Sequence, residues 1–295
     1  MFKKLLIANR GEIAVRIIRA ARELGISTVA VYSEADKNSL HTILADEAIC
    51  IGPAKSTSSY LNMNAVLSAA IVTKAEAIHP GFGFLSENSK FATLCEEMNI
   101  KFIGPSGKVM DKMGDKINAR AEMIKANVPV IPGSEGEVFT VEEALKIADE
   151  IGYPVMLKAS AGGGGKGIRK VESKEALAPA FESASQEALA AFGNGAMYIE
   201  KVIYPARHIE VQILGDSFGN IVHLGERDCS LQRNNQKVLE ESPSVAIGTS
   251  LRNEMGEAAV RAAKAVSYEN AGTIEFLLDE KTRQFFFMEM NTRVQ

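Results

Sequence analysis

The stretch from Val155 to Val171 combines residue types that hold phosphate groups. An apolar run ends in Lys158, and four glycines, a lysine and a fifth glycine follow before a second strand-like run. Glycines let backbone N–H groups face an anion because no Cβ stands in the way, and lysines add positive charge. The P-loop pattern is not met, since Ser160 and Gly167 replace its first glycine and its magnesium-binding hydroxyl. We expect a flap that joins two strands over a phosphate; the alternative is a flexible linker.

Two glutamates, Glu275 and Glu289, form the second candidate, each within an apolar run near the end of the chain. A hairpin with its loop at 280–284 pairs Asp279 with Phe285 and therefore Glu275 with Glu289. Directly opposed side chains lie about 5 Å apart at Cβ. Carboxylates that close repel each other unless a proton or a cation lies between them. The alternative is a pair of edge-strand glutamates that face water.

Asn291 lies two residues beyond Glu289 and therefore on the same face of the strand. Glutamate and asparagine offer only oxygen ligands, which suit Mg²⁺ or Mn²⁺ rather than Zn²⁺. Arg293 takes the next position on that face, and a guanidinium suits a carboxylate or phosphate anion. Together with the glycine-rich flap, these residues predict an enzyme that handles ATP phosphates through a divalent metal.

The composition is that of an ordinary globular protein of 295 residues. Its net charge of −4 argues against general binding to nucleic acid or to a membrane surface. The cysteines, Cys50, Cys95 and Cys229, are odd in number and lack metal-type spacing, which favours a reducing compartment. No apolar run is long enough for a signal peptide or a membrane span, so we expect a cytoplasmic location.

Residues 1–104 alternate short apolar runs with stretches of helical periodicity, which predicts a parallel sheet with helices on both faces. The loop over 79–88 follows one of these strands, where open α/β sheets place their ligand crevice. Its proline and glycines fit a functional loop or a tight turn equally well. Residues 9–12 resemble the first turn of a dinucleotide fold but contain one glycine, so a structural role is favoured there.

A connecting helix is expected over 105–127, with Lys116 on a charged face that solvation explains best. Residues 127–133 then end the helical pattern and mark a boundary. The segment over 130–203 holds the flap and a long helix over 174–191, which predicts a small α+β lid.

The remaining segment is expected to be antiparallel. Residues 207–214 alternate with period two and the chain returns at 221–224, which predicts a hairpin. The polar stretch 226–237 is expected to be a loop, either at the same cleft or at the surface. A helix over 251–266 leads to the hairpin that carries the two glutamates.

Stretches in all three segments resemble biotin carboxylase, a family of ATP-grasp enzymes, and most of all the separate biotin carboxylase subunit of bacterial acetyl-CoA carboxylase. They are Leu6–Ala14, the loop over 79–88, Lys158–Gly167, Glu226–Gln232 and Glu289–Gln295.

The resemblance implies an α/β fold in which a Rossmann-like domain with a parallel sheet is followed by an ATP-grasp fold. The Rossmann-like domain would cover 1–113 and a linker helix 114–129. The α+β lid would cover 130–203, and the N-terminal part of the antiparallel C-terminal domain would cover 204–295.

The implied reaction is the phosphorylation of bicarbonate by ATP to carboxyphosphate, which then carboxylates biotin on a biotin carboxyl carrier protein. This is the first half-reaction of acetyl-CoA carboxylase in fatty acid synthesis. The alternatives are the biotin carboxylase part of pyruvate or propionyl-CoA carboxylase, another ATP-grasp ligase, or a non-catalytic nucleotide-binding fragment. Mg²⁺ or Mn²⁺, carboxyltransferase subunits and a homodimer are also implied.

The same resemblance assigns roles to individual residues, and Lys116 enters through it alone. The residues expected to hold the ATP phosphates are Lys116, Lys158, Gly163, Gly164 and Gly165, and those expected to line the adenine pocket are Glu200, Lys201, Val202 and Ile203. His208 and Gln232 would lie near the ribose, and Glu275, Glu289 and Asn291 would bind the metal. Lys237 and Arg293 would hold bicarbonate and the developing charge.

Two positions depart from the family pattern. Asn235 stands where histidine is frequent, so that ribose contact is not carried over, and Phe82 stands where tyrosine is common. The family continues past Gln295 with Val-Glu-His, whose glutamate is the base for bicarbonate, and a later arginine contacts biotin. We therefore expect the chain to stop inside the catalytic motif and, by itself, to be unable to carboxylate biotin.

Overall fold

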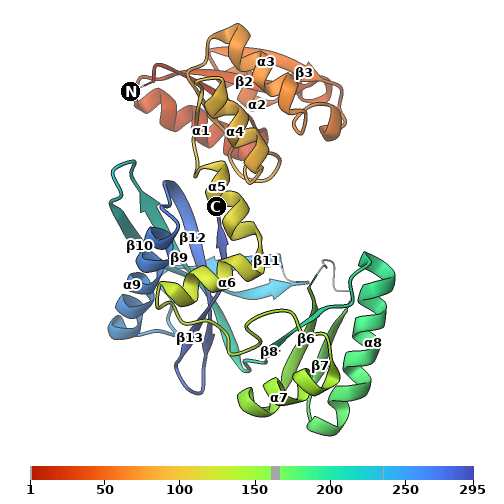
Figure 1. Ribbon diagram of the computed structural model, residues 1–295. Coiled ribbons are helices and arrows are strands. Elements are labelled where there is room, and N and C mark those ends of the chain that lie inside the picture. Colours follow the sequence, from red (N-terminus) through yellow and green to blue (C-terminus); the bar gives the residue numbers. More distant parts are fainter. Residues whose placement is uncertain (1, 161–166, 235) are drawn as a thin grey trace.

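The computed structural model describes residues 2–160, 167–234 and 236–295 (Figure 1). The flap glycines Gly163, Gly164 and Gly165 lie outside the described residues, and so does Asn235, which departs from the family pattern. The strands of the described part form three sheets, and the sheet formed by the last part of the chain lies between the other two.

The first sheet is parallel, and helices cover both of its faces. In order across the sheet, its strands are β3 (Glu47–Gly52), β2 (Ser27–Ser33), β1 (Lys4–Ile7), β4 (Ala77–His79) and β5 (Lys101–Phe102). The helices and short 3-10 turns of this unit are α1 (Gly11–Glu23), η1 (Glu34–Asp36), α2 (Leu40–Leu44), η2 (Ser56–Ser58), α3 (Met63–Thr73) and α4 (Ser89–Glu97).

The alternation of β1 divides the core of this unit in two. Leu5 and Ile7 pack against α1, and Leu6 packs with α3 and α4 on the opposite face. Successive side chains of a strand point to opposite faces, so a central parallel strand is apolar on both. The predicted α/β class is therefore confirmed.

The connecting segment is two helices, α5 (Gly107–Gly114) and α6 (Lys116–Lys125), so the single helix expected over 105–127 is wrong. Asp115 between them has an extended backbone (φ −89°, ψ 115°). Its carboxylate accepts hydrogen bonds from the N–H groups of Ile117 at 2.9 Å and Asn118 at 3.0 Å. This N-cap starts a new helix where apolar spacing alone suggests a continuous one.

The smallest sheet is antiparallel and is covered by α7 (Val141–Ile151) and α8 (Lys174–Phe192). Its strands, in order, are β7 (Ile168–Val171), β6 (Val155–Ala159) and β8 (Met197–Lys201). Lys158 on β6 pairs with Ile168 on β7. The glycine-rich segment thus joins two neighbouring strands, as expected, and not a strand and a helix.

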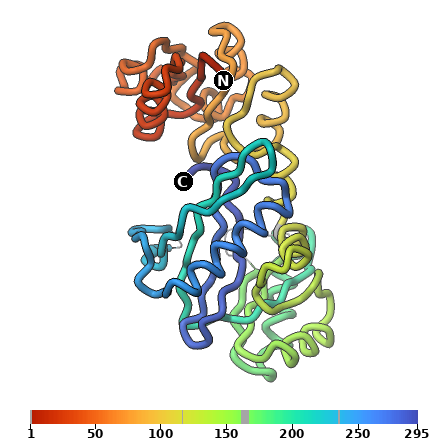
Figure 2. Tube along the Cα trace, turned by 90° about the vertical axis from the view of Figure 1, so that its left-hand side faces the viewer, coloured from red at the N-terminus to blue at the C-terminus, as the bar shows by residue number. Residues whose placement is uncertain are grey.

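The central sheet is antiparallel, with α9 (Thr249–Ala265) packed on one face. Its strands, in order, are β11 (Gln236–Glu241), β10 (Ile221–Arg233), β9 (Ala206–Gly215), β12 (Asn270–Asp279) and β13 (Phe285–Asn291). Figure 2 shows this sheet between the N-terminal unit and the smallest sheet, with the carboxyl terminus beside the N-terminal unit.

Within the polar stretch 226–237, residues 226–233 lie on β10 and residues 236–237 lie on β11, so the expected loop is wrong. Its acidic residues are buried but paired: Glu226 accepts from Arg252 at 2.8 Å, and Asp228 accepts from Ser244 at 3.0 Å. Buried polar groups are tolerated when their hydrogen bonds are made. The composition of this stretch therefore resembles that of a loop, although its backbone forms strands.

The glutamate hairpin has the predicted pair but not the predicted register at its tip. Phe285 pairs with Leu278, not with Asp279. A β-bulge then adds Met288 to β13 without a partner on β12, and beyond it Glu275 pairs with Glu289. The expected face for both glutamates is confirmed because the bulge offsets the error at the turn.

In the described part of the chain, no helix combines the length and the apolar character needed to cross a bilayer.

The central sheet gives a test of its core. Phe276 on β12 is fully buried, and its ring lies edge-to-face against Phe285 with centroids 5.2 Å apart. We expect Phe276→Ala to lower the free energy of unfolding by about 3–5 kcal/mol because it leaves a cavity. Met288→Ala, at the 40% exposed bulge position, is the control and should cost under about 1 kcal/mol. Urea unfolding of both variants measures this, and equal midpoints would contradict the assignment of the core.

Candidate functional site

Three carboxylates lie in one row across neighbouring strands of the central sheet. Glu210 on β9 pairs with Glu275 on β12, and Glu275 pairs with Glu289 on β13. Paired residues of a sheet place their side chains on the same face. Glu210 and Glu275 are 0% and 2% exposed, whereas Glu289 is exposed. The row therefore runs from the buried interior of the sheet to its edge.

Cationic side chains neutralise the two buried carboxylates. Lys237 Nζ, on β11, lies 2.5 Å from Oε2 of Glu210 and 2.6 Å from Oε1 of Glu275. Arg227 on β10 also pairs with Glu210. Burial alone would lower the pKa of Lys237, but its hydrogen bonds to both glutamates outweigh burial and leave that pKa raised. Lys237 is therefore held charged between two carboxylates.

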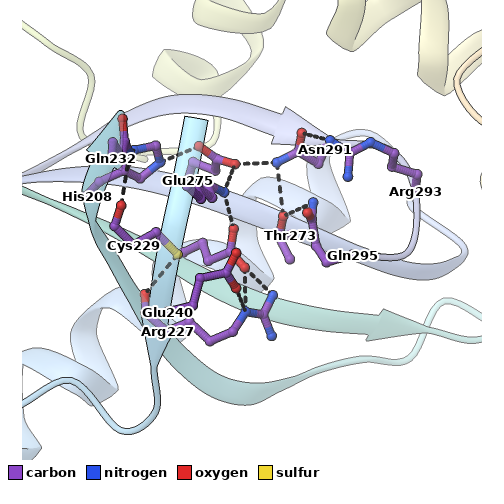
Figure 3. A network of polar contacts seen from close by, with 12 residues as sticks. His208, Arg227, Cys229, Gln232, Glu240, Thr273, Glu275, Asn291, Arg293 and Gln295 are labelled. Carbon is purple, nitrogen blue, oxygen red and sulfur yellow. Dashed lines mark hydrogen bonds and ion pairs between the residues drawn. The ribbon is translucent and has the colours of Figure 1, made fainter. Parts of the chain in front are cut away.

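His208 binds the second oxygen of Glu275 (Figure 3). Its Nδ1 accepts a hydrogen bond from Gln232 Nε2 at 2.7 Å, so its Nε2 carries the proton that Glu275 accepts. Burial alone would raise the pKa of Glu275, but the hydrogen bonds from His208 and Lys237 outweigh it and hold that pKa at about 2. Glu275 is an ionised carboxylate at neutral pH.

Asn291 and Arg293 extend this network toward the chain end (Figure 3). Asn291 Nδ2 donates to Glu275 and, at 3.2 Å, to Oγ1 of Thr273. Arg293 Nη2 donates to Oδ1 of Asn291 at 3.1 Å. Asn291 thus turns its nitrogen to Glu275 and its oxygen to Arg293.

The predicted metal ligands match a hard divalent cation by residue type and lie on one face of the sheet, although Asn291 turns its amide nitrogen, not its oxygen, toward Glu275. Glu275 is ionised, and Glu289 and Asn291 stand beside it on the same face of the sheet. Ionised carboxylate and amide oxygens are the ligands that Mg²⁺ prefers.

Two cavities lie near this face. One, of about 330 Å³, lies between the start of α6 and the smallest sheet. The other, of about 400 Å³, is lined by Glu289 and Asn291 among others. Gly114 lines both, so the two cavities are neighbours.

Two of the residues predicted to hold ATP line the first cavity. Lys158 and Glu200 both line it and form an ion pair with each other. Lys201 turns away, with Nζ donating to the carbonyls of Gly152 and Tyr153 at 2.9 Å each. The other lining residues are Gly114, Asp115, Ile117, Arg120, Glu135, Ala159, Ser160 and Tyr198.

The remaining predicted residues have mixed placements. The N–H groups of Lys201 and Val202 donate to the carbonyls of Pro132 and Pro154, so both are used within the fold. Ile203 follows directly after them, beyond the end of β8. Lys116 is the first residue of α6, directly after the cavity residue Asp115.

Sequence reasoning missed three residues of the site. Glu210 and Arg227 lie in the row of paired charges, and Glu87 accepts from Arg293 Nε at 3.0 Å. For Glu210 a signal existed, because the period-two alternation of 207–214 puts it on the same face as His208. For Arg227 and Glu87 no local pattern identifies the partner.

Comparisons with known proteins agree with this architecture. Residues 1–110 match the family described as biotin carboxylase, N-terminal domain, and residues 115–295 match carbamoyl-phosphate synthase L chain, ATP binding domain. The chain belongs to the biotin carboxylase family. Biotin carboxylase 1 of Bacillus subtilis is 60% identical over 295 residues, which are 100% of this chain and 66% of the relative.

Solved structures of biotin carboxylases share the fold. A biotin carboxylase–beta-gamma-ATP complex from Campylobacter jejuni has a TM-score of 0.89 at 55% identity and is matched over 100% of this chain and 66% of that chain. The biotin carboxylase domain dimer of the Hydrogenobacter thermophilus 2-oxoglutarate carboxylase, in complex with MgADP, ADP and bicarbonate, has a TM-score of 0.86 at 52% identity, over 100% and 65%. The chain thus spans about two thirds of the length of these biotin carboxylases.

The depressed pKa of Glu275 predicts a pH dependence of stability. A carboxyl group whose pKa falls on folding stabilises the native state above its unfolded pKa of about 4.5, and that contribution is lost as the pH falls toward 2. We expect Glu275→Gln to remove part of the decline in unfolding free energy between pH 4.5 and 2.

The matched control is Glu172→Gln, whose side chain is 68% exposed. Chemical denaturation at a series of pH values measures the slope. A slope in Glu275→Gln equal to that of the control would contradict the assigned contacts.

Proposed function

We propose that the protein is a biotin carboxylase: it uses ATP and bicarbonate to carboxylate biotin on a biotin carboxyl carrier protein. A bicarbonate oxygen attacks the γ-phosphorus, the bond to ADP breaks, and carboxyphosphate forms. The ureido nitrogen of biotin then bonds to the carboxyl carbon, the bond from that carbon to the phosphate oxygen breaks, and the proton of the nitrogen passes to the released phosphate. The observation that carries the proposal is the row of carboxylates, paired with Lys237 at Glu275 and lining a cavity with Glu289 and Asn291 at the edge of the sheet.

The nucleotide would occupy the cavity at the smallest sheet. Lys158 would hold its phosphates, and Glu200 is already paired with it there. Lys116 and the glycines Gly163, Gly164 and Gly165 are proposed for the phosphates on family resemblance. Lys201, Val202 and Ile203 are proposed for the adenine, and His208 and Gln232 for the ribose.

Bicarbonate would bind near Glu275. Lys237 and Arg293 would hold it, since both are cationic, Lys237 contacts Glu275, and Arg293 contacts Asn291, which itself donates to Glu275. Glu275, Glu289 and Asn291 would hold Mg²⁺ or Mn²⁺, which when bound neutralises phosphate oxygens. The bicarbonate and MgADP in the complex from Hydrogenobacter thermophilus support this choice of ligands.

The wider assignment is part of the same proposal. The proposed units are a Rossmann-like domain at 1–113, a linker at 114–129, a lid at 130–203 that closes over ATP, and the N-terminal part of the C-terminal domain at 204–295. The protein would act in the cytoplasm as a homodimer, with carboxyltransferase subunits, in the acetyl-CoA carboxylase of fatty acid synthesis. Pyruvate or propionyl-CoA carboxylase is the alternative, and the biotin carboxylase domain of a 2-oxoglutarate carboxylase among its relatives shows that acceptors differ within the family.

The test is ATP cleavage by the intact protein in buffer freed of carbon dioxide. We expect phosphate release only on addition of bicarbonate, with further stimulation by free biotin. Cleavage that depends on another carboxylate instead would assign a different ATP-grasp ligase. Nucleotide binding without turnover at saturating bicarbonate and biotin would assign a binding module.

Glu289→Gln tests the metal assignment. We expect about tenfold or greater loss of ATP cleavage at limiting Mg²⁺, a change of about 1.4 kcal/mol or more, because one charged oxygen ligand is lost. Binding of ATP without metal should be unchanged. The control is Glu241→Gln, an exposed position on β11. Equal activity of both variants at limiting Mg²⁺ would refute the assignment.

A further inference from the structure

Glu87 joins the N-terminal unit to the residues that follow the last strand, Thr292 and Arg293. Its Oε2 accepts from Arg293 Nε at 3.0 Å. Its Oε1 accepts from the N–H of Thr292 at 3.2 Å and from Oγ1 of Thr292 at 3.3 Å. In the sequence, Glu87 is separated from Thr292 by 205 positions and from Arg293 by 206 positions. One carboxylate therefore fixes both the end of the last strand and the arginine beyond it.

The backbone around Glu87 is itself held firmly. Asn88 caps α4, with its side chain accepting from the N–H of Phe91 at 2.9 Å. The N–H of Ser86 donates to the carbonyl of Gly83 at 2.9 Å. At the start of the loop, Asn9 Nδ2 donates to the carbonyls of Pro80 at 2.7 Å and Phe82 at 2.8 Å. A loop tied at both ends presents its carboxylate from a defined direction.

We propose that Glu87 is a positioning residue for bicarbonate binding: it sets the direction of the Arg293 guanidinium. The guanidinium is planar, and it is bound on two sides, through Nε by Glu87 and through Nη2 by Asn291. Two anchors on a planar group fix its plane, and its other N–H donors are left to bind an anion. The inference rests on the proposed role of Arg293 toward bicarbonate.

The pair is poorly suited to a purely stabilising role. The side chains of Glu87 and Arg293 are 43% and 23% exposed, and ion pairs in such positions contribute little to stability. A second ion pair joins the same two parts of the molecule away from the site: Lys101 on β5 lies 2.6 Å from Glu269, just before β12, with side chains 51% and 33% exposed. Glu269→Gln is therefore a matched control.

The first measurement needs no ligand. Solvent exchange of the Arg293 Nε–H is followed by ¹⁵N NMR, with the signal assigned by its absence in Arg293→Lys. We expect Glu87→Gln to speed this exchange about tenfold, because a neutral acceptor holds the N–H less strongly, and Glu269→Gln to leave it unchanged. Melting temperatures should agree among the wild type and both variants. Exchange in Glu87→Gln as slow as in wild type would overturn the proposal.

The second measurement is a bicarbonate titration at saturating MgADP. We expect Glu87→Gln to raise the Kd for bicarbonate about tenfold, equivalent to about 1.4 kcal/mol, while the Kd for MgADP stays the same. A parallel loss of both affinities would mean a structural role and overturn the proposal. A wild-type protein that binds MgADP but not bicarbonate would refute the proposed function of Arg293, and the ligand-free exchange would still report whether Glu87 orients it.

Discussion

Repulsion between like charges is the constraint on which the site depends. Glu210, Glu275 and Glu289 are paired across three neighbouring strands, and two of them are buried. Buried carboxylates at that spacing cannot both stay ionised without cations between or beside them. Lys237 lies between the two buried glutamates and Arg227 lies at the inner end. Lys237 lies on β11, so the buried glutamates of β9 and β12 depend on β11 for their shared cation.

The same arrangement divides the face of the sheet by function. At its inner end cationic side chains pair with the buried glutamates, and at the edge the exposed side chain of Glu289 lines a cavity. His208 donates a hydrogen bond to Glu275 as a neutral ring, because Gln232 donates to its Nδ1 and leaves the proton on Nε2. This bond is made to Oε2 of Glu275, whereas Lys237 binds Oε1.

Much of this fold follows from residue patterns, and the failures have definite causes. The β–α alternation of the N-terminal unit and the two strands flanking the glycines were predictable, because apolar periodicity and glycine spacing are local properties. The strand over 226–233 was missed because a buried polar face has the composition of a loop. The break at Asp115 was missed because a capping side chain outweighs continuous apolar spacing.

The site was predictable only in part, for a related reason. The pair of Glu275 with Glu289 was inferred from a regular hairpin, and it survives because the bulge at Met288 compensates for a turn that is one residue out of register. Family resemblance supplied Lys237, whose partners lie on distant strands, whereas Arg293 followed from its spacing beyond Asn291. Glu87 is identified only by a contact across two units of the fold, which no pattern within one segment encodes.

The bulge also separates the tip of the hairpin from its base. Pairs on the loop side, such as Leu278 with Phe285, follow one register, and pairs on the site side, such as Thr273 with Asn291, follow another. Loss of Met288 would merge the two registers and still leave Glu289 opposite Glu275. The alignment of Glu275 with Glu289 is therefore set by the register on the site side of the bulge and not by the register at the tip of the hairpin.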